Sequence, residues 1–591
     1  MFTKSLHMKN RIFLLLSWVF MVAYLPLYAD TPEKWEDMNE TVAILSFNDF
    51  HGAFVENKAL DIPGIARMVS CIKALQKKYD HVYVVSAGDN LSGSYFSDQT
   101  RGAVWKEVKK LIGNGKIVSA LGNHEFDWGK EFAIKSYKDR DFYYTASNMV
   151  PKDTADKAAY PHYWNRTIRL KNGKDNIYIY TQGLMTMETK RKSGERTDWF
   201  EMEMPMKNVP TTTPPSGRLY LLLGHIGTIM NGSTPEFMPE SYEGKDCQLA
   251  ELPYKSTYDA FVTGHSHNEV CGLINKKPVV QAGCYGRKIG VIVYKLEKNP
   301  KGEIRFKYDS CYLEDVMKYD PDPATQAIMD TWINKPEYNF AQKLTFCNDD
   351  LKYGRENMQQ FTPIGALVTR SYANYYRKRM KDNYSVVYGI SNYKGQRSGL
   401  SKGSVTKLDA GNVLPLSGQL VAFELTGREF IKLIEKGINN PDGWIQTHDL
   451  MMQYSRENFT TLKVEYLFRQ DGDSYETYFE RFEDIPKVIV VLEKYLADGN
   501  DGYDKTLFTK PVSSFNSLPD RKKTTDVFFE YLQTKEELNK DEPIYPQFNL
   551  IRPYKPKTAS SEKQASLPAD LLQDIRPESM YDERPRMSLQ P

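Results

Sequence analysis

The chain has 591 residues, more than one hydrophobic core usually serves, so we expect two large domains. Apolar residues make up 41% and charged residues 26% of the sequence, which is typical of a folded globular protein and excludes a disordered or fibrous one. The formal net charge is +2, so no global field favours nucleic acid or an anionic membrane, and an anionic substrate has to be attracted locally.

The N-terminal segment has the pattern of an export signal. Three basic residues at positions 4–11 precede an apolar run at 12–27, which ends at the small residue Ala29. This pattern predicts a signal peptide over residues 1–29. A membrane anchor is the alternative, because the run is near the lower limit for spanning a bilayer. The polar, acidic stretch after Ala29 favours cleavage, so we expect an exported protein in the periplasm or at the cell surface, without stable membrane insertion.

Short apolar, β-branched runs predict buried strands in the first half of the chain, and each run stops at a polar cluster. They cover residues 41–47, 82–86, 117–121, 177–183, 219–224 and 260–264. Between the first two runs, residues 62–79 have the apolar spacing of a helix. Alternating strands and helices of this kind predict an α/β layer.

The second half begins after a Pro-bounded segment at residues 320–336, which predicts an inter-domain helix. We therefore expect a first domain at 41–315, a linker at 316–343 and a second, strand-rich domain at 344–556. The remaining stretch, 557–591, is polar and contains Pro and Ser, which predicts a disordered tail.

Six cysteines are dispersed along the chain without a CxxC pair, which argues against a zinc knuckle or a redox motif. They are Cys71, Cys247, Cys271, Cys284, Cys311 and Cys347. Export permits disulfides, but the sequence leaves their pairing open.

Polar loops follow the predicted strands and collect the side chains that divalent metals bind. Such loops at the carboxyl ends of strands are where sites of α/β layers usually lie. Five of the nine histidines fall in these loops; any one alone would be an ordinary surface or core residue, but their recurrence predicts a metal site. The polar residues concerned are Asp49, His51, Asp89, Asn123, His124, Asp127, His225, His265 and His267.

In this order, the motifs DxH, GDxxxG, GNHExD, GH and GHxH resemble those of the calcineurin-like metallophosphoesterases. The words NDFHG, GNHEFDWG and VVQAGCYGRKIG resemble the 5′-nucleotidase/UDP-sugar hydrolase branch of that superfamily. The resemblance covers residues 41–315 strongly and 345–510 weakly. It implies α/β and α+β domains: a layered α/β/β/α metallophosphoesterase domain, a helix linker and a second α+β domain that binds substrate.

The resemblance also implies two divalent metal ions, zinc, manganese or a mixed pair. The first would be held by Asp49, His51, Asp89 and His267. The second would be held by Asp89, Asn123, His225 and His265, so that Asp89 bridges the two. Their residual positive charge would bind a phosphoryl group, and they would lower the pKa of a water nucleophile. His124, oriented by Asp127, would stabilise the phosphoryl oxygens or the leaving group; a purely structural role for this histidine is the alternative.

In the second domain the resemblance implies four substrate-binding residues: Asn392, Arg397, Tyr495 and Asp501. Arg397 would hold phosphate and Tyr495 would stack on a base. Two positions depart from the family pattern. Leu416 follows Pro415 where a second aromatic wall is usual, and residues 360–366 lack the expected arginine, for which Arg355 or Tyr393 could substitute.

Taken together, these residues predict two-metal hydrolysis of phosphoesters, with a 5′-nucleotidase or a nucleotide diphosphate hydrolase as the expected enzyme. The partner would be a small phosphoester rather than a nucleic acid polymer. One alternative is another substrate, such as a sugar phosphate, a cyclic nucleotide or a sulfur-oxyanion ester. A non-catalytic nucleotide-binding protein is a second alternative, although no metal ligand of the family pattern is missing.

Overall fold

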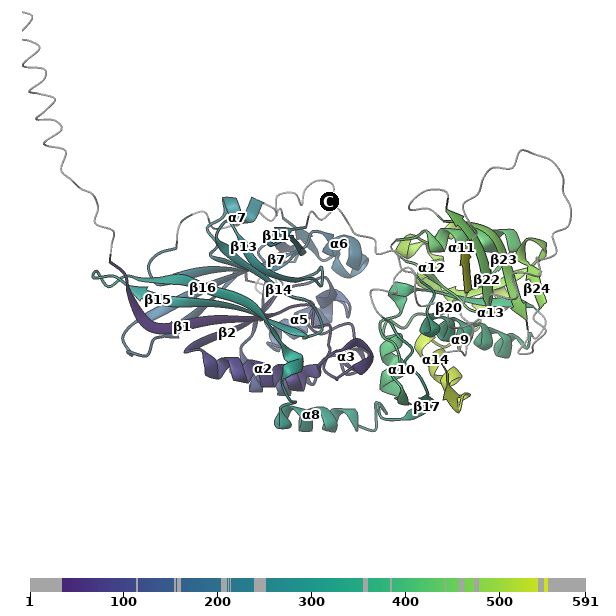
Figure 1. Ribbon diagram of the computed structural model, residues 1–591, viewed down its shortest axis with the longest axis horizontal. Coiled ribbons are helices and arrows are strands. Elements are labelled where there is room, and N and C mark those ends of the chain that lie inside the picture. The colour runs from purple at the N-terminus through teal and green to yellow at the C-terminus, as the bar shows by residue number, and fades with distance from the viewer. Residues whose placement is uncertain are drawn as a thin grey trace, which may run out of the picture.

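The computed structural model describes residues 34–112, 115–153, 156, 161–203, 210, 212, 214–238, 251–353, 360–382, 385–441, 443–456, 462–471, 478–539 and 547–550 (Figure 1). The predicted signal peptide and tail lie outside this part of the chain, as do Cys247 and Arg355. Within it, no helix has both the length and the apolar character needed to cross a membrane.

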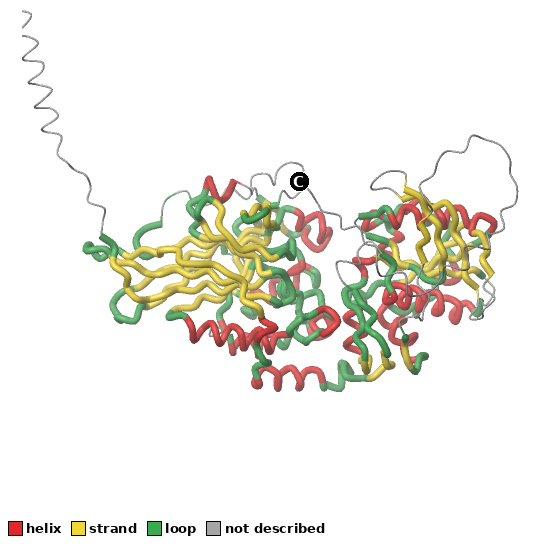
Figure 2. The backbone as a smooth tube through the Cα atoms, in the orientation of Figure 1, coloured by secondary structure: helices red, strands yellow, loops and turns green. Residues whose placement is uncertain are grey.

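Two six-stranded sheets form the first domain (Figure 2). The first sheet has the order β16 (Ile304–Asp315), β15 (Lys288–Lys298), β1 (Glu36–Phe47), β2 (His81–Ser86), β3 (Val118–Ala120) and β4 (Tyr143–Thr145). The second has the order β13 (Glu269–Ile274), β14 (Lys277–Ala282), β12 (Ala260–Thr263), β9 (Arg218–His225), β7 (Asn176–Met185) and β6 (Tyr163–Arg169). All six strands predicted from apolar runs are among them.

The central strands of both sheets carry apolar residues on both faces because each sheet is covered on both sides. Ile44 and Val85 of the first sheet meet Leu221 and Val262 of the second in a fully buried core between the sheets. The outer face of the first sheet packs against α2 (Gly64–Lys78), the helix predicted at 62–79. Further helices near that face are α3 (Tyr95–Thr100), α4 (Trp105–Val108) and α5 (Lys130–Lys138).

On its outer face the second sheet packs against α7 (Leu252–Lys255) and the hairpin β10 (Thr228–Asn231) and β11 (Thr234–Phe237). The layers therefore confirm the expected α/β/β/α arrangement. Smaller elements beside them are β5 (Met149–Pro151), β8 (Phe200–Met202) and α6 (Glu188–Ser193).

Strand direction explains where the polar loops gather. β1, β2 and β3 are parallel neighbours, and so are β7, β9 and β12. The carboxyl ends of parallel strands lie at one edge of a sheet, so the loops that follow these strands meet at one end of the sandwich.

The linker contains α8 (Pro323–Ile333), which lies within the inter-domain helix predicted at 320–336. Its start follows from the sequence, because Asp322 caps it by accepting the Thr325 N–H at 3.0 Å and proline occupies the first turn. In Figure 1 this helix runs beneath the first domain toward the second.

The second domain is α+β. Its central sheet has the order β20 (Leu420–Leu425), β25 (Val488–Glu493), β18 (Val386–Asn392) and β21 (Ile445–Gln446). A second sheet contains β24 (Tyr478–Arg481), β23 (Leu462–Asp471), β22 (Leu450–Arg456) and β27 (Gln547–Leu550), and a third contains β19 (Gly403–Thr406), β17 (Lys343–Cys347) and β26 (Glu537–Leu538). Its helices are α9 (Pro363–Met380), α10 (Lys407–Val413), α11 (Gly427–Ile438), α12 (Lys494–Ala497), α13 (Ser513–Asn516) and α14 (Thr524–Gln533).

The two domains contact each other where α3 packs on α10. The Tyr95 ring lies 5.9 Å from Phe340 and 5.7 Å from Phe529, and the Tyr95 N–H donates to Asn412 Oδ1 at 3.2 Å. Gly411 permits this approach, since a Cβ there would collide with the Tyr95 ring. Because α3 follows the loop after β2, the second domain docks directly beside the polar loops of the first.

Candidate metal centre and substrate cleft

The loops after β1 and β12 form the first cluster of predicted ligands. His51 Nε2 lies 3.1 Å from His267 Nε2, and Asp49 Oδ1 lies 3.5 Å from the same His267 nitrogen. His51 Nε2 is 3.8 Å from Asp89 Oδ2. Four side chains from three loops, the last of them more than 200 residues beyond the first, thus converge on one point.

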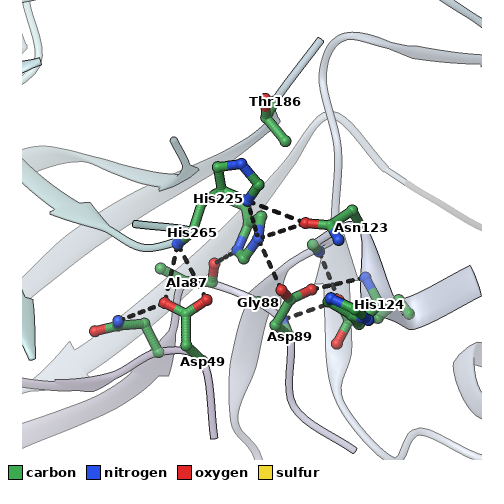
Figure 3. Close-up of polar contacts among 12 residues, drawn as sticks. Asp49, Ala87, Gly88, Asp89, Asn123, His124, Thr186, His225 and His265 are labelled. Atoms are coloured by element: carbon green, nitrogen blue, oxygen red, sulfur yellow. Dashed lines mark hydrogen bonds and ion pairs between the residues drawn. The ribbon is translucent and has the colours of Figure 1, made fainter. Parts of the chain in front are cut away.

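The second cluster also contains Asp89, together with Asn123, His225 and His265 (Figure 3). His225 Nε2 is 3.1 Å from Asp89 Oδ2 and 3.2 Å from Asn123 Oδ1. His265 Nδ1 is 3.0 Å from Asn123 Oδ1 and 3.3 Å from His225 Nε2. All seven predicted metal ligands therefore fall into two adjoining groups, and Asp89 belongs to both.

The backbone of these loops is strained. Left-handed φ values, between 47° and 75°, occur at non-glycine residues that carry the predicted ligands. These residues are Asp49, His51, Asp89, His265 and His267. Such conformations cost roughly 1–3 kcal/mol each and persist only where the surrounding structure enforces them, typically at functional sites.

Three of the four predicted histidine ligands are held by a contact to the other ring nitrogen, which leaves one nitrogen facing the clusters. The contacts are His51 Nδ1 to the Ser92 carbonyl at 3.0 Å, His225 Nδ1 to the Ala87 carbonyl at 2.8 Å, and His265 Nε2 to Glu188 Oε2 at 3.3 Å. Partners of this kind fix the tautomer and orientation of histidines that bind metals.

The charges of the site fit divalent cations. Asp49 and Asp89 are buried, and no lysine or arginine in the described part of the chain forms an ion pair with either. Burial alone would raise the pKa of Asp49, but the nearby His267 and His225 outweigh it and lower this pKa to about 2. Conversely, burial opposes protonation of His225, yet Asp89 raises its pKa to about 9. The two buried carboxylates thus favour positive charge in this part of the site, which divalent cations would supply.

His124 lies beside the clusters and is bound to Asp127. Its Nδ1 is 2.7 Å from Asp127 Oδ2, and its main-chain N–H donates to Asp89 Oδ1 at 2.8 Å. Burial works against protonation of this imidazole, but the carboxylates of Asp89 and Asp127 prevail and raise its pKa. Asp127 in turn accepts hydrogen bonds from Ser92 Oγ at 2.8 Å and Arg196 Nη1 at 3.0 Å. The arrangement favours a positively charged imidazole next to the two clusters of predicted metal ligands.

Three of the predicted substrate-binding residues meet in the second domain. Asp501 accepts hydrogen bonds from Asn392 Nδ2 at 2.7 Å and from the Tyr495 hydroxyl at 3.3 Å. The Tyr495 side chain is 50% exposed, so its ring is available to a flat ligand, and the substituted wall residue Leu416 is 42% exposed.

Arg397 is the fourth and lies apart from these three, facing the first domain. Its positive charge acts on His124, and its Nε is buried without a hydrogen-bond partner. It lines a cleft of about 780 Å³ that also contains His267 and Tyr285 of the first domain. A buried, unpartnered guanidinium N–H beside the clusters is suited to a phosphate oxygen.

The same cleft holds an aromatic surface that the sequence did not indicate. Tyr353 and Tyr393 stack with ring centroids 4.6 Å apart and an interplanar angle of 15°. Tyr393, considered above as a substitute for the missing arginine, is therefore buried against a second tyrosine.

Sequence reasoning also missed residues that act through the predicted ligands. Glu188 was not among the predicted residues, but its Oε2 lies 3.3 Å from His265 Nε2. Glu125, the neighbour of His124, accepts hydrogen bonds from the main-chain N–H groups of Asp89 at 3.0 Å and Gly122 at 2.6 Å. Its place in the GNHE word was the only available signal.

Comparison with known proteins finds matches to both halves of the chain. The calcineurin-like phosphoesterase family model matches residues 42–269, and the model of the 5′-nucleotidase C-terminal domain matches residues 346–508. The chain is 25% identical over 419 residues to Endonuclease YhcR of Bacillus subtilis, which covers 67% of this chain and 33% of that protein. It is 24% identical over 461 residues to the 5′-nucleotidase of Vibrio vulnificus, covering 70% and 78%, respectively.

Among solved structures, that of a 5′-nucleotidase precursor from Thermus thermophilus matches with a TM-score of 0.60 at 18% identity, covering 87% of this chain and 99% of that one. The chain spans only a third of the length of the B. subtilis endonuclease. Both family models match in order, so the chain carries a calcineurin-like phosphoesterase domain followed by a 5′-nucleotidase C-terminal domain and is a metal-dependent phosphoester hydrolase.

Proposed function

We propose that this chain hydrolyses nucleoside 5′-monophosphates to nucleosides and phosphate, with two divalent cations at the clusters described above. The observation that carries the proposal is the pair of ligand groups sharing Asp89, with His124 on one side and Arg397 of the second domain facing it. Nucleotide diphosphates with the same terminal phosphoryl group are included in the proposed class.

In this proposal Asp49, His51, Asp89 and His267 hold the first cation. Asp89, Asn123, His225 and His265 hold the second. The donors are nitrogen and oxygen atoms, which suit zinc, manganese or a mixed pair. When bound, two such cations supply Lewis-acid charge to a phosphoryl group and make a water molecule acidic near neutral pH.

The side chains around the cations have separate tasks. His124, kept protonated by Asp89 and Asp127, donates a proton or a hydrogen bond to the oxygen that leaves. Arg397 binds a phosphoryl oxygen through its free Nε–H. Asp127 positions the imidazole and does not touch the substrate.

The nucleoside would lie on the second domain. Tyr495 stacks on the base, and Asp501 and Asn392, already joined by a hydrogen bond, bind the sugar or the base edge. We also propose that the protein acts outside the cytoplasm, in the periplasm or at the cell surface, on the strength of the predicted signal peptide.

The experiment is a comparison of kcat/KM for AMP, UMP and glycerol phosphate in wild type, Tyr495→Ala and Leu416→Phe. Tyr495→Ala should weaken both nucleotides and spare glycerol phosphate, which has no base. Leu416→Phe restores the second wall and should improve nucleotide binding by about 0.5–1.5 kcal/mol, the usual worth of an aromatic pair.

The exposed Leu416 favours one alternative, a phosphoester without a nucleobase, such as a sugar phosphate. Unchanged ratios among the three substrates in both variants would favour that alternative over the proposal. Bound metal without turnover of any ester would instead indicate a binding protein.

A further inference from the structure

Two cysteine side chains meet at the edge of the sandwich, away from the metal centre. Cys271 belongs to β13 and Cys311 to β16, and their Sγ atoms are 3.1 Å apart. β13 is the outermost strand of the second sheet, and β16 is the outermost strand of the first. The sulfur atoms therefore face each other across the gap between the two sheets, at the same edge of both.

The strand registers fix this approach. Cys271 lies opposite Val280 of β14, and Cys311 lies opposite Ile292 of β15. Val280 and Ile292 belong to the apolar core between the sheets, and both cysteines pack against that core. The four strands are hydrogen-bonded neighbours within their sheets. The main chain of either cysteine therefore cannot move away without breaking hydrogen bonds between strands.

The other cysteines behave differently. Cys71, Cys284 and Cys347 are buried, and no second pair of sulfur atoms is in contact within the described ranges. Cys271 and Cys311 are each partly exposed, so a soluble oxidant can reach them. Among the described cysteines, Cys271 and Cys311 are thus the one pair whose sulfur atoms are in contact and also accessible to an oxidant.

We propose that Cys271 and Cys311 form a disulfide bond that joins the two sheets of the sandwich. A bond needs the sulfur atoms at about 2.05 Å, roughly 1 Å closer than the present contact, a distance that small side-chain rotations cover. This inference rests on exposure to an oxidising compartment and not on the proposed substrate.

The reaction is an exchange with a small-molecule or protein disulfide. One cysteine thiolate attacks that disulfide, forms a mixed disulfide and displaces the first thiolate of the oxidant. The second cysteine thiolate then attacks the sulfur of the first cysteine in the mixed disulfide; the bond between the two cysteines forms, and the oxidant's second thiolate leaves. The two cysteines lose two protons and two electrons, and the oxidant gains both as two thiols.

The bond would close a loop between residues 40 positions apart. That loop contains β14 and β15, and Cys271 lies four positions after His267 on the strand that leaves the metal centre. The cross-link would therefore restrain the unfolded chain and hold β13 against the first sheet. From the loop length and the size of the first domain we expect the oxidised protein to melt roughly 3–7 °C above the reduced one.

The test uses the full mature chain, reduced and then equilibrated with excess oxidised glutathione. Remaining thiols are alkylated under denaturing conditions, and the protein is digested without reduction and analysed by mass spectrometry. We expect a peptide pair joined through Cys271 and Cys311, with Cys71 and Cys347 alkylated. Because Cys247 lies outside the described residues, the mapping is repeated on Cys247→Ser, where the same pair must persist.

Thermal melting provides the second measurement. The difference in Tm between oxidised and reduced protein should vanish in Cys311→Ser and in Cys271→Ser, and it should remain in Cys247→Ser. The proposal is overturned if Cys271 and Cys311 stay alkylatable after oxidation, if they end as glutathione adducts, or if either pairs with another cysteine. The mapping on wild-type protein decides this even if a serine variant fails to fold.

Discussion

Replacing His124 by alanine separates the chemical step from metal binding. The main-chain N–H of residue 124, which donates to Asp89 Oδ1 at 2.8 Å, is retained in the variant, so the shared carboxylate keeps its position. The imidazole itself is engaged by Asp127 at 2.7 Å. We therefore expect His124→Ala to keep both metals while kcat for AMP falls by roughly 10²–10⁴. This factor corresponds to about 2.7–5.4 kcal/mol in activation free energy.

The assay pairs kcat with metal content per chain, measured on the same preparation by mass spectrometry of the elements. An aryl phosphate with a good leaving group should lose less activity than AMP, because its leaving oxygen needs less protonation. Asp127→Asn is the matched control: it keeps the imidazole and should cost less than removing it. The ligand atoms of His51, Asp89 and His124 also lie within 4.8 Å of one another, close enough to share a metal ion. A fall in metal content parallel to the fall in rate would therefore make His124 a ligand and refute this reasoning.

Two further substitutions test the supports of the site. Gly122→Ala should abolish activity and lower metal content, since a Cβ at this position collides with Asp89 Oδ1; wild-type metal content would show that the loop adapts. Glu188→Gln should lower the metal affinity of one of the two sites by about 10–100-fold, because Glu188 Oε2 orients His265. The control is Glu195→Gln, an exposed change in the same segment, which should leave both metal affinities unchanged. Metal affinity is measured by competition with a chelator. Equal affinities in wild type and Glu188→Gln would show that Glu188 does not support metal binding through His265.

The grouping of the seven predicted ligands could be anticipated from the sequence for a physical reason. Each ligand, from Asp49 to His267, stands at the carboxyl end of a strand or in the short loop that follows it, and parallel strands bring these ends to one edge. The layered fold could be expected on the same grounds, because the strand segments that are covered on both sides, such as residues 42–47 of β1 and 219–223 of β9, are almost entirely apolar.

Other features depend on how separate elements pack, which local pattern does not encode. The position of Arg397 opposite His124 follows from the docking of Tyr95 on α10 between the domains. The stacked Tyr353 and Tyr393 come from different elements of the second domain. Likewise, the contact between Cys271 and Cys311 requires the register of two sheets, so the spacing of the cysteines could not reveal it.

The two-metal account depends most directly on Asp89, the one carboxylate that belongs to both clusters. Asp89→Asn keeps the size of the side chain but removes the buried charge that balances two cations. The decisive measurement is metal content per chain together with kcat/KM for AMP in this variant. The account predicts loss of activity and of at least one metal ion per chain. Two metal ions per chain with wild-type turnover would contradict it.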